Sequence, residues 1–536
     1  MHIKMKTLAA LLTPVILLFA AAYMQWGISG LPPIQHIAEP TAPTPAEEPF
    51  GFPFWMRWTH YINLFLLILL IRSGLQILFD HPRLYWNIHS TPGTEWIRFT
   101  PVELTPERAW TSKEDSRYLT PWVGLPGKKH TVGMARHWHF LSILFWFVNG
   151  VVYLFFLFYT PHWRRLVPTS WSVVPDAWAV FVHYATFHMP YEPNGFYNFN
   201  ALQQISYFAV VFILSPLSAF TGPSMSPALT SRYKWYPKLP GNRQTGRSLH
   251  FLVMAGFILF IVIHVTMVAA TGFARNMNHI VMGTDDLNPI GMYLGFVGII
   301  VVILANFWAH HAAWKHPRQV QHAASHLVTP VMTSLLARSA PIVQFSPEDI
   351  SPFFWANGKI PTSDDWKRLA ADNFKHYRLR VDGLVENKVE LSLEDLEALG
   401  KHQQITLHHC IQGWSGIAEW GGLPVRELIN FVKPKKNATA VVFYSYGEGG
   451  EGGQYYESLT IENALYLQTL LAYEMNYKPL NHLHGAPLRL RVENQLGFKM
   501  VKWIQSIRFV EDLSKVNKGE GGYDEDYEYF GEQANI

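Results

Sequence analysis

The sequence predicts an α-helical transmembrane bundle followed by a mixed α+β domain, and two observations support this division. Up to about residue 314, long uncharged stretches alternate with short basic loops, whereas the composition beyond about residue 341 is that of a soluble domain. Only 15% of the residues are charged, although about 25% is usual in soluble domains. A net charge of +3, without a basic run carrying interleaved aromatic residues, argues against nucleic acid as a partner.

A helix that spans a bilayer needs ~20 mostly apolar residues, and six stretches meet this requirement. Another apolar stretch, Trp171–His188, is bounded by prolines and predicts an interfacial or re-entrant segment. The first of the six resembles a signal peptide, but its apolar run is long and no clear cleavage site follows, so we expect a retained anchor in membrane lipid. The six expected spans are Thr7–Gln25, Phe54–Phe79, Trp138–Tyr159, Ala201–Phe220, Ser248–Gly272 and Leu287–Trp314.

The loops predict the orientation of these spans. Asp80–Arg136 and Thr221–Arg247 are rich in Lys and Arg, and alternation of the helices puts both loops on one side. The positive-inside rule places that side in the cytoplasm, together with the chain after Trp314. We therefore expect a multi-pass protein of the cytoplasmic (inner) membrane with a cytoplasmic C-terminal domain. The N-terminus has no twin-arginine signal before an apolar run, which agrees with this expectation.

The C-terminal half combines strand and helix patterns. Alternating apolar residues in "HYRLRVDGLV", "KNATAVVFYSY" and "LRLRVENQLGFKMVKWIQSIRFV" predict strands. "LSLEDLEALG" and "LPVRELINFV" have helical spacing. The chain is therefore expected to divide into an anchor and linker (1–50), a membrane domain (51–318), a linker (319–344) and an α+β domain (345–536).

Four histidines in the apolar stretches predict two metal centres. His250 and His264 are fourteen residues apart, which corresponds to ~21 Å along a helix and brings both within ~40° of the same face. By depth in the membrane, His60 pairs with His264 and His139 pairs with His250. A single histidine can also line a cavity or lie at the interface, and His137 and His183 are competing candidates for the pairs.

The membrane segments resemble the di-haem cytochrome b subunits of formate dehydrogenase and nickel–iron hydrogenase. The resemblance lies in "FPFWMRWTHYINLFLLILLIRSG", "ARHWHFLSILFWFVNG", "QISYFAVVFILSPLSAFTG" and "GRSLHFLVMAGFILFIVIHVTMVAATG", and covers roughly residues 50 to 315. It implies two b haems held by the four histidines and exchange of electrons with quinone or quinol. The extra N-terminal stretch and the long Asp80–Arg136 loop depart from that pattern.

The only cysteine, Cys410, closes the alternating string "QITLHHC". Lone cysteines are usually small buried hydrophobic residues. This one is expected at the end of a strand, followed by a loop and a short helix, so that its thiol lies at the rim of a sheet. Thiolate is the softest side-chain ligand for a transition metal such as molybdenum.

"LHHCIQGWSGIAEWGGLPVREL" resembles the molybdenum-cysteine segment of the sulfite oxidase superfamily. Further similar segments follow the family order: "SPFFWANGKIP" (351–361), "VVFYS", "AYEMNYKPLNHLHGAPLRL" and "LGFKMVKWIQSI". The resemblance implies that Cys410 ligates molybdenum in a molybdopterin cofactor and is the catalytic residue. The cofactor-binding positions that it implies are Phe354, Trp355, Ala356, Asn357, Ser445, His484, Arg489, Met500, Val501 and Lys502.

Departures from sulfite oxidases shape the expected activity. The arginine-rich string that follows their cysteine is absent, with no positive charge before Arg426, and Trp355 and Ala356 stand where they place an arginine. The tryptophans are more similar to the branch that includes the protein-methionine-sulfoxide reductase catalytic subunit. We expect quinone, two haems and molybdenum to exchange electrons, and a small S-oxide or N-oxide to be reduced. The alternatives are a sulfite-type dehydrogenase that donates electrons to quinone, and an electron-transfer or scaffold protein without molybdenum.

Overall fold

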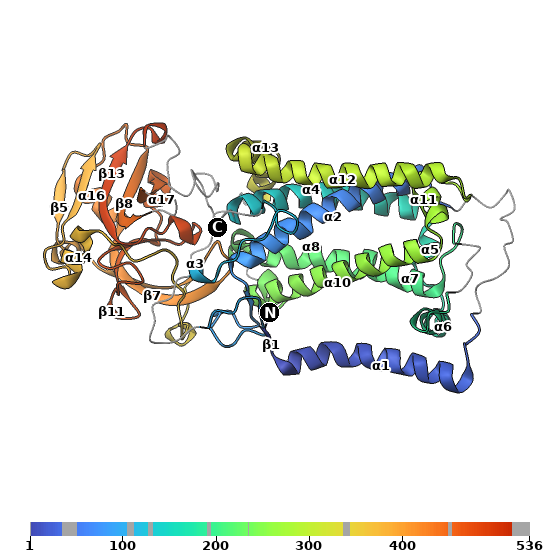
Figure 1. Ribbon diagram of the computed structural model, residues 1–536. Coiled ribbons are helices and arrows are strands. Elements are labelled where there is room, and N and C mark those ends of the chain that lie inside the picture. The colour runs from blue at the N-terminus through green and yellow to red at the C-terminus, as the bar shows by residue number, and fades with distance from the viewer. Residues whose placement is uncertain are drawn as a thin grey trace.

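The computed structural model describes residues 2–34, 51–103, 112–126, 132–189, 195–233, 235–335, 344–448 and 453–516. A bundle of long helices forms one part of the molecule, and a sheet-rich domain lies at one end of this bundle (Figure 1). The predicted fold class is therefore confirmed.

Six candidate membrane spans occur in the described residues, as the sequence predicts. The fourth span is built from α7 (Ala201–Phe208), the π-helix η1 (Ala209–Leu214) and α8 (Ser215–Ser224). The other five spans are continuous α-helices: α1 (Met5–Ser29), α2 (Phe54–Asp80), α4 (Val132–Tyr159), α10 (Arg243–Ala270) and α12 (Pro289–Lys315).

The apolar stretch at Trp171–His188 forms the helix α6 (Val173–Ala185), which packs against α1 and α7. Its 13 residues are too few to cross a bilayer, which takes ~20. Part of the expected linker is also helical, because α13 (Pro317–Leu335) continues after α12 and packs against α4. Residues 336–343 of that linker lie outside the described residues, and the domain boundaries at 50, 318 and 344 stay predictions.

The two departures from the cytochrome pattern lie together in the structure. Strand β1 (His2–Ile3), just before α1, pairs with β3 (Ile97–Arg98) in the loop after α2, and β3 also pairs with β2 (Arg83–Leu84). This small sheet lies at the end of the bundle nearest the C-terminal domain (Figure 1). The N-terminus and the long loop therefore help to shape the face on which that domain packs.

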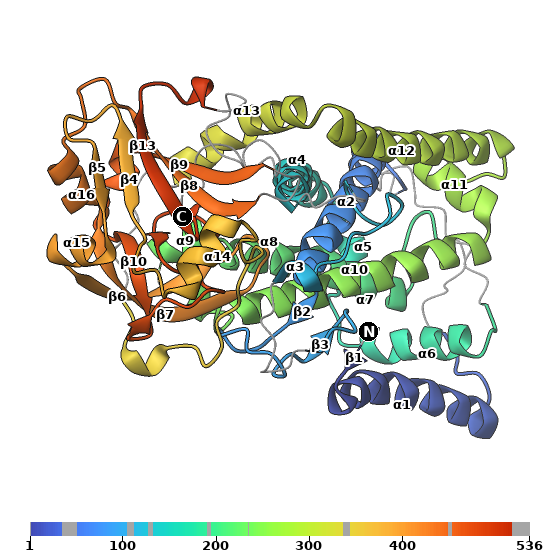
Figure 2. The ribbon, with the colours of Figure 1, turned by 60° about the vertical axis from the view of Figure 1, so that its left-hand side comes forward.

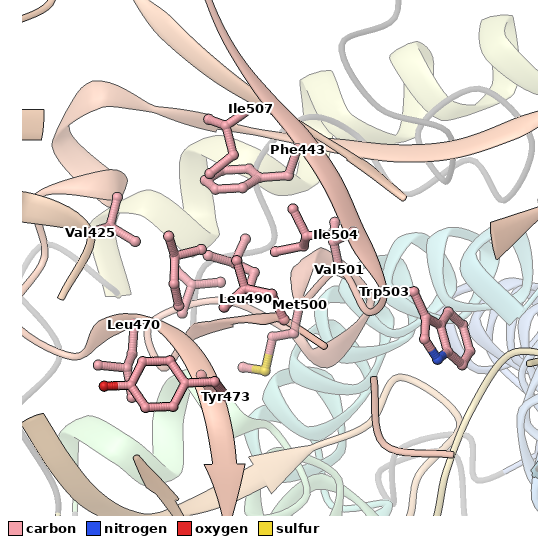
Figure 3. Packing of buried hydrophobic residues seen from close by; sticks show 14 of the residues in the cluster. Val425, Phe443, Leu470, Tyr473, Leu490, Met500, Val501, Trp503, Ile504 and Ile507 are labelled. Atoms are coloured by element: carbon pink, nitrogen blue, oxygen red, sulfur yellow. The ribbon is translucent and has the colours of Figure 1, made fainter. Parts of the chain in front are cut away.

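The C-terminal domain contains two five-stranded sheets around one apolar core (Figure 3). The first has the order β5-β4-β13-β8-β9, and β13 runs parallel to β4. Its strands are β4 (Leu379–Gly383), β5 (Val389–Leu391), β8 (Ala440–Glu448), β9 (Gln454–Thr460) and β13 (Ile504–Val510).

The second sheet has the order β11-β10-β7-β6, and β12 also pairs with β10. Its strands are β6 (His402–His409), β7 (Ser415–Pro424), β10 (Thr469–Met475), β11 (Lys478–Pro479) and β12 (Arg489–Val492). The long string that begins at Leu488 therefore forms two strands, β12 and β13, separated by the 3₁₀ turn Gly497–Lys499.

The two helices expected in this domain are present. In α15 (Leu393–Ala398), Ser392 and Asp395 form a reciprocal capping box that satisfies backbone N–H groups at the helix start. In α16 (Val425–Val432), four apolar side chains are buried on one face. Both predictions from helical spacing are confirmed.

One expectation about Cys410 is wrong. The thiol does follow a strand, β6, but the next element is the strand β7 rather than a loop and a helix, and α16 comes only after β7. Every residue of β7 is buried. A strand buried on both faces shows no alternation of apolar and polar residues, so its sequence gave no period-two signal.

Candidate functional site

The four predicted haem ligands form two facing pairs inside the helix bundle. The ring centroids of His60 and His264 are 6.4 Å apart, and those of His139 and His250 are 6.3 Å apart. Two metal–imidazole bonds of about 2 Å each, together with the two ring radii, span roughly this distance. Helix α10 carries one member of each pair, while α2 and α4 supply the partners.

Hydroxyl groups hold three of these imidazoles at Nδ1. His139 Nδ1 lies 3.0 Å from Ser73 Oγ, His250 Nδ1 lies 2.9 Å from Thr221 Oγ1, and His264 Nδ1 lies 3.5 Å from the Tyr207 hydroxyl. Such contacts fix the ring orientation and leave Nε2 for a metal. The residues therefore fit bis-histidine haem sites.

The competing histidines are bound differently. His137 Nδ1 lies 2.9 Å from the Gly133 carbonyl, and His183 Nε2 lies 3.0 Å from the Pro32 carbonyl. Neither ring faces a second imidazole in the described part of the chain. The pairing by depth therefore favours His60, His139, His250 and His264 as the haem ligands.

Cys410 begins a tight turn between β6 and β7. Its N–H donates to the Trp414 carbonyl at 3.2 Å, and the Gly413 N–H donates to the Cys410 carbonyl at 3.1 Å. Gly413 has a φ of +108°, which favours glycine. Burial raises the pKa of the Cys410 thiol to about 12, so a metal would have to displace its proton on binding.

An aromatic cluster surrounds Phe354 close to the cysteine turn. Its ring lies edge-on to those of Trp414 and His484, with centroids 5.7 Å away in both cases. His484 Nε2 also lies 3.0 Å from the Phe354 carbonyl. The structure thus brings together the 351–361 segment, the cysteine turn and the "HGAPLR" segment, which are far apart in the sequence.

Two buried cations lie next to this cluster. Arg489 Nη1 donates to the His484 carbonyl at 3.0 Å, and its Nε has no hydrogen-bond partner. Lys502 Nζ donates to the carbonyls of Leu483, at 3.0 Å, and Asn357. Burial first, and then repulsion from neighbouring arginines, lowers the pKa of both groups well below their usual ranges.

Within the described residues, no carboxylate forms an ion pair with Arg489 or Lys502. The neighbouring Arg491, in contrast, forms an ion pair with Glu493 at 2.8 Å. An uncompensated buried charge is costly, and a phosphate group is a strong acceptor for a guanidinium. The pair Arg489 and Lys502 therefore fits the anionic end of a molybdopterin cofactor.

The other expected cofactor positions divide into two groups. Ser445 Oγ donates to the Lys502 carbonyl at 2.7 Å, and Met500 and Val501 are buried nearby. Trp355 and Ala356 instead contact the membrane domain, because the Trp355 indole donates to the Ser90 carbonyl at 2.8 Å and the Ala356 carbonyl accepts from the Ser112 N–H at 2.8 Å. Their roles in cofactor binding stay predictions.

Sequence reasoning missed the membrane-domain side of the site. Arg243 Nη1, at the start of α10, donates to the carbonyls of Gly413 at 3.1 Å and Trp414 at 3.2 Å. The string after Cys410 has no positive charge before Arg426 along the chain, but Arg243 brings a cation to the cysteine turn in space. No signal in the sequence indicates that residues 170 positions apart meet here.

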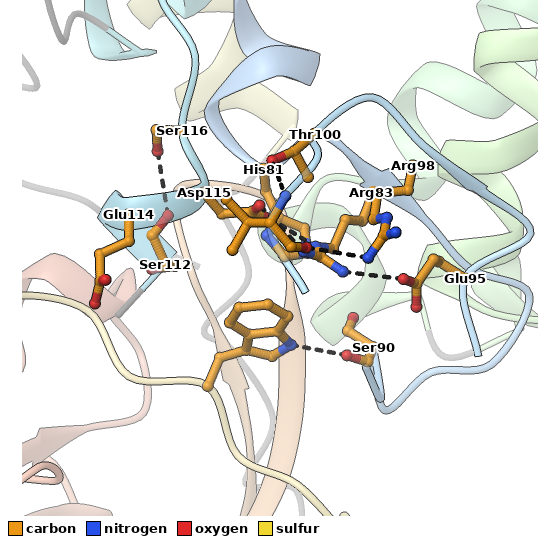
Figure 4. Close-up of polar contacts among 12 residues, drawn as sticks. His81, Arg83, Ser90, Glu95, Arg98, Thr100, Ser112, Glu114, Asp115 and Ser116 are labelled. Atoms are coloured by element: carbon orange, nitrogen blue, oxygen red, sulfur yellow. Dashed lines mark hydrogen bonds and ion pairs between the residues drawn. The ribbon is translucent and has the colours of Figure 1, made fainter. Parts of the chain in front are cut away.

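The contact region between the membrane domain and the cysteine turn is called the junction. An ion-pair cluster fixes the loop after α2 beside this junction. Arg83 lies 2.6 Å from an Asp115 carboxylate oxygen and 2.9 Å from Glu95 (Figure 4). All three residues are buried. Because both acids come from the same loop, the loop keeps one shape under the cysteine turn.

Comparisons with known proteins support both domains. A family model described as prokaryotic cytochrome b561 matches residues 51–283, and one described as oxidoreductase molybdopterin binding domain matches residues 366–517. The chain therefore joins a cytochrome b domain to a molybdopterin-binding oxidoreductase domain, as the sequence predicts, while the presence of two haems stays a prediction.

Similar individual proteins match only in part. A protein of Azospira oryzae, provisionally named protein-methionine-sulfoxide reductase subunit YedZ1, is 36% identical over 157 residues, or 29% of this chain and 55% of that protein. The protein-methionine-sulfoxide reductase catalytic subunit MsrP of Xanthomonas campestris pv. campestris is 33% identical over 178 residues, or 31% and 55% of the two chains. The chain thus spans about half the length of these curated relatives.

A solved structure, the sulfane dehydrogenase SoxCD from Paracoccus pantotrophus, is 21% identical with a TM-score of 0.24. The match covers 27% of this chain and 41% of that chain.

The histidine pairs generate the first prediction. His264→Ala should remove one b haem and leave the other, because His139 and His250 form a separate pair. The pyridine haemochrome assay measures the haem content per protein. His183→Ala is the matched control and should retain both haems, and two haems in the His264 variant would contradict the pairing.

The cysteine turn generates the second prediction. Cys410→Ser replaces a soft ligand by a hard hydroxyl of similar size, so the protein should fold with its haems while oxidation of reduced haem by substrate falls about a hundredfold or more. Stopped-flow absorbance of the haems measures this rate. Near-normal activity in the variant would reduce Cys410 to a core residue.

Proposed function

We propose that this chain, which joins a cytochrome b domain to a molybdopterin-binding domain, is a membrane-bound molybdenum oxidoreductase that reduces a small S-oxide or N-oxide. Electrons enter from quinol, pass through two b haems and reach molybdenum at Cys410. The single observation that carries the proposal is that α10, which bears His250 and His264, is hydrogen-bonded to the cysteine turn.

The position of α10 supports direct electron transfer within one chain. Gln244 Nε2 donates to the Gly413 carbonyl and the Ser415 hydroxyl, both at 3.0 Å. His250 follows six residues later, which is ~9 Å along the helix. The proposed haem at His139 and His250 would therefore lie close to the turn that holds the thiolate.

The reaction balances with the two kinds of carrier. An S-oxide takes up two electrons and two protons to give a sulfide and water, and oxidation of one quinol supplies the same numbers. The molybdenum cofactor, when bound, supplies two-electron oxygen-atom chemistry, whereas haems carry single electrons. The imidazoles would hold the haem irons and Cys410 would hold molybdenum. Arg489 and Lys502 would bind the anionic end of the molybdopterin cofactor.

The charges near the thiol favour a neutral substrate over sulfite. Arg243 uses its guanidinium on the carbonyls of Met225, Gly413 and Trp414. Arg489 and Lys502 are assigned to the cofactor by this proposal. A sulfite-type dehydrogenase would need a further cation for its anionic substrate, so this alternative is the weaker one.

The side of the membrane is part of the proposal. The Asp80–Arg136 and Thr221–Arg247 loops both meet the C-terminal domain, as helix alternation requires, and we place them in the cytoplasm. Arg83, Arg243 and Arg247 are however buried in this junction. These three arginines hold the junction together whichever side of the membrane it lies on. The orientation therefore depends mainly on the other Lys and Arg residues of the two loops.

The activity generates the third prediction. Anaerobic protein with reduced haems should be reoxidised by an S-oxide or an N-oxide, while the oxidised protein should not be reduced by sulfite. Absorbance of the haems records both reactions, and Cys410→Ser is the control for non-specific oxidation. Reduction by sulfite without any reoxidation by oxides would reverse the direction of the enzyme.

The orientation generates the fourth prediction. A reporter fused after Ile536 should be active as a cytoplasmic fluorescent protein and inactive as alkaline phosphatase, because the C-terminal domain lies on the side of the basic loops. A fusion after Thr160, in the short loop at the opposite end of α4, is the matched control and should behave in the opposite way. Phosphatase activity from the C-terminal fusion would place the substrate outside the cytoplasm.

A further inference from the structure

We propose that the membrane domain covers one side of the Cys410 thiol, and that the site therefore admits small S-oxides or N-oxides but not methionine sulfoxide within a protein. This inference rests on the proposed function for its substrate half. Its structural half, called the composite wall, is that residues of both domains surround the thiol.

The cysteine turn is buried to an unusual degree for a connection between two strands. Connections of this kind normally run over the surface and are solvated. Here the exposed fractions are 3% for Cys410, 5% for Ile411, 0% for Gln412, 1% for Trp414 and 0% for Ser415. Elements of the membrane domain cover the turn, since they supply most of the hydrogen bonds made by its side chains.

Gln412 joins the thiol to the membrane domain through one side-chain amide. The Cys410 Sγ lies 3.9 Å from Gln412 Oε1, which also accepts a hydrogen bond from the Ser112 hydroxyl in α3 (Ser112–Asp115). Gln412 Nε2 donates to Ser116 Oγ at 3.2 Å and to the Asp80 carbonyl at 3.5 Å. One amide therefore separates the sulfur from three groups of the membrane domain.

The remainder of the turn is held from two more directions. Arg243 and Gln244 of α10 bind the carbonyl of Gly413. In the loop after α2, the Ile88 carbonyl accepts from the Ser415 hydroxyl at 2.8 Å and Ser90 Oγ accepts from the Ser415 N–H at 3.3 Å. In Figure 1 and Figure 2 the β7 strand of the C-terminal domain lies beside α3.

These contacts limit what can approach the thiol from this side. A sulfoxide within a polypeptide brings its own backbone and neighbouring side chains, so the two domains would have to separate. Separation would break several hydrogen bonds at once, and each lost bond would lower the rate about fivefold. A small oxide needs no separation, because only its oxygen and a few heavy atoms must reach the metal.

The substrate half is tested with the full-length holoenzyme in detergent micelles and reduced viologen as the electron donor. Dimethyl sulfoxide and free methionine sulfoxide are compared with oxidised casein at equal sulfoxide concentration. We expect turnover of the small oxides and a rate on casein about a hundredfold or more lower, as the loss of several hydrogen bonds would give. Equal rates on casein would overturn the inference, whereas inactivity on every oxide would count against the proposed function instead.

The wall is tested without substrate by the variant Ser112→Ala, with Ser170→Ala as the matched control at the opposite end of the bundle. Removing the Ser112 hydroxyl takes away the donor to Gln412 Oε1, the atom that lies 3.9 Å from the Cys410 sulfur. The electron paramagnetic resonance spectrum of the Mo(V) state should therefore change in Ser112→Ala and stay unchanged in Ser170→Ala, with the haem content equal in both. Identical spectra in the two variants would overturn the composite wall even if small oxides remain the preferred substrates.

Discussion

The contact between the start of α10 and the cysteine turn is the constraint on which the arrangement of both domains depends. Arg243 and Gln244 both donate to the Gly413 carbonyl, at 3.1 and 3.0 Å. The same helix then continues through His250 and His264, one for each histidine pair. One helix therefore sets the distance from the cysteine turn to both proposed haems, and a change in its position would alter all three sites together.

Charged donors hold together the face of the membrane domain that meets the cysteine turn. Arg247 donates to the carbonyls of Arg83 and His81, both at 2.6 Å, while Arg83 itself is paired with Asp115 and Glu95. Hydrogen bonds from charged groups are worth about 1.5–3 kcal/mol each, but a buried charge that loses its acceptors is strongly destabilising. The loop after α2 and the start of α10 are thus expected to move as one unit, which suits electron transfer over a fixed distance.

The sequence predicted the parts of the structure that depend on local patterns. Six apolar stretches became six candidate spans because length and hydropathy alone decide that property. The histidine pairs followed from helical periodicity, and the strand before Cys410 followed from alternation. Strand β7 was missed because burial on both faces removes the alternation, and α13 was missed because its residues were assigned to a linker.

The junction itself could not be predicted from the sequence. Gln412 and Ser112 are 300 positions apart, and Ser112 lies in the long loop that departs from the cytochrome pattern. Arg243 was counted as a loop charge that reports topology, whereas it binds the cysteine turn. Contacts of this kind depend on how two independently recognisable domains pack, which no local period or composition encodes.

The most direct measurement is the rate at which substrate oxidises reduced haem when each lipid nanodisc holds one copy of the protein. Electron transfer through α10 is intramolecular, so the rate constant for haem oxidation by dimethyl sulfoxide or free methionine sulfoxide should not change as the protein is diluted at fixed substrate concentration. A rate constant that falls in proportion to protein concentration would contradict transfer within one chain, and would require electrons to pass between separate molecules.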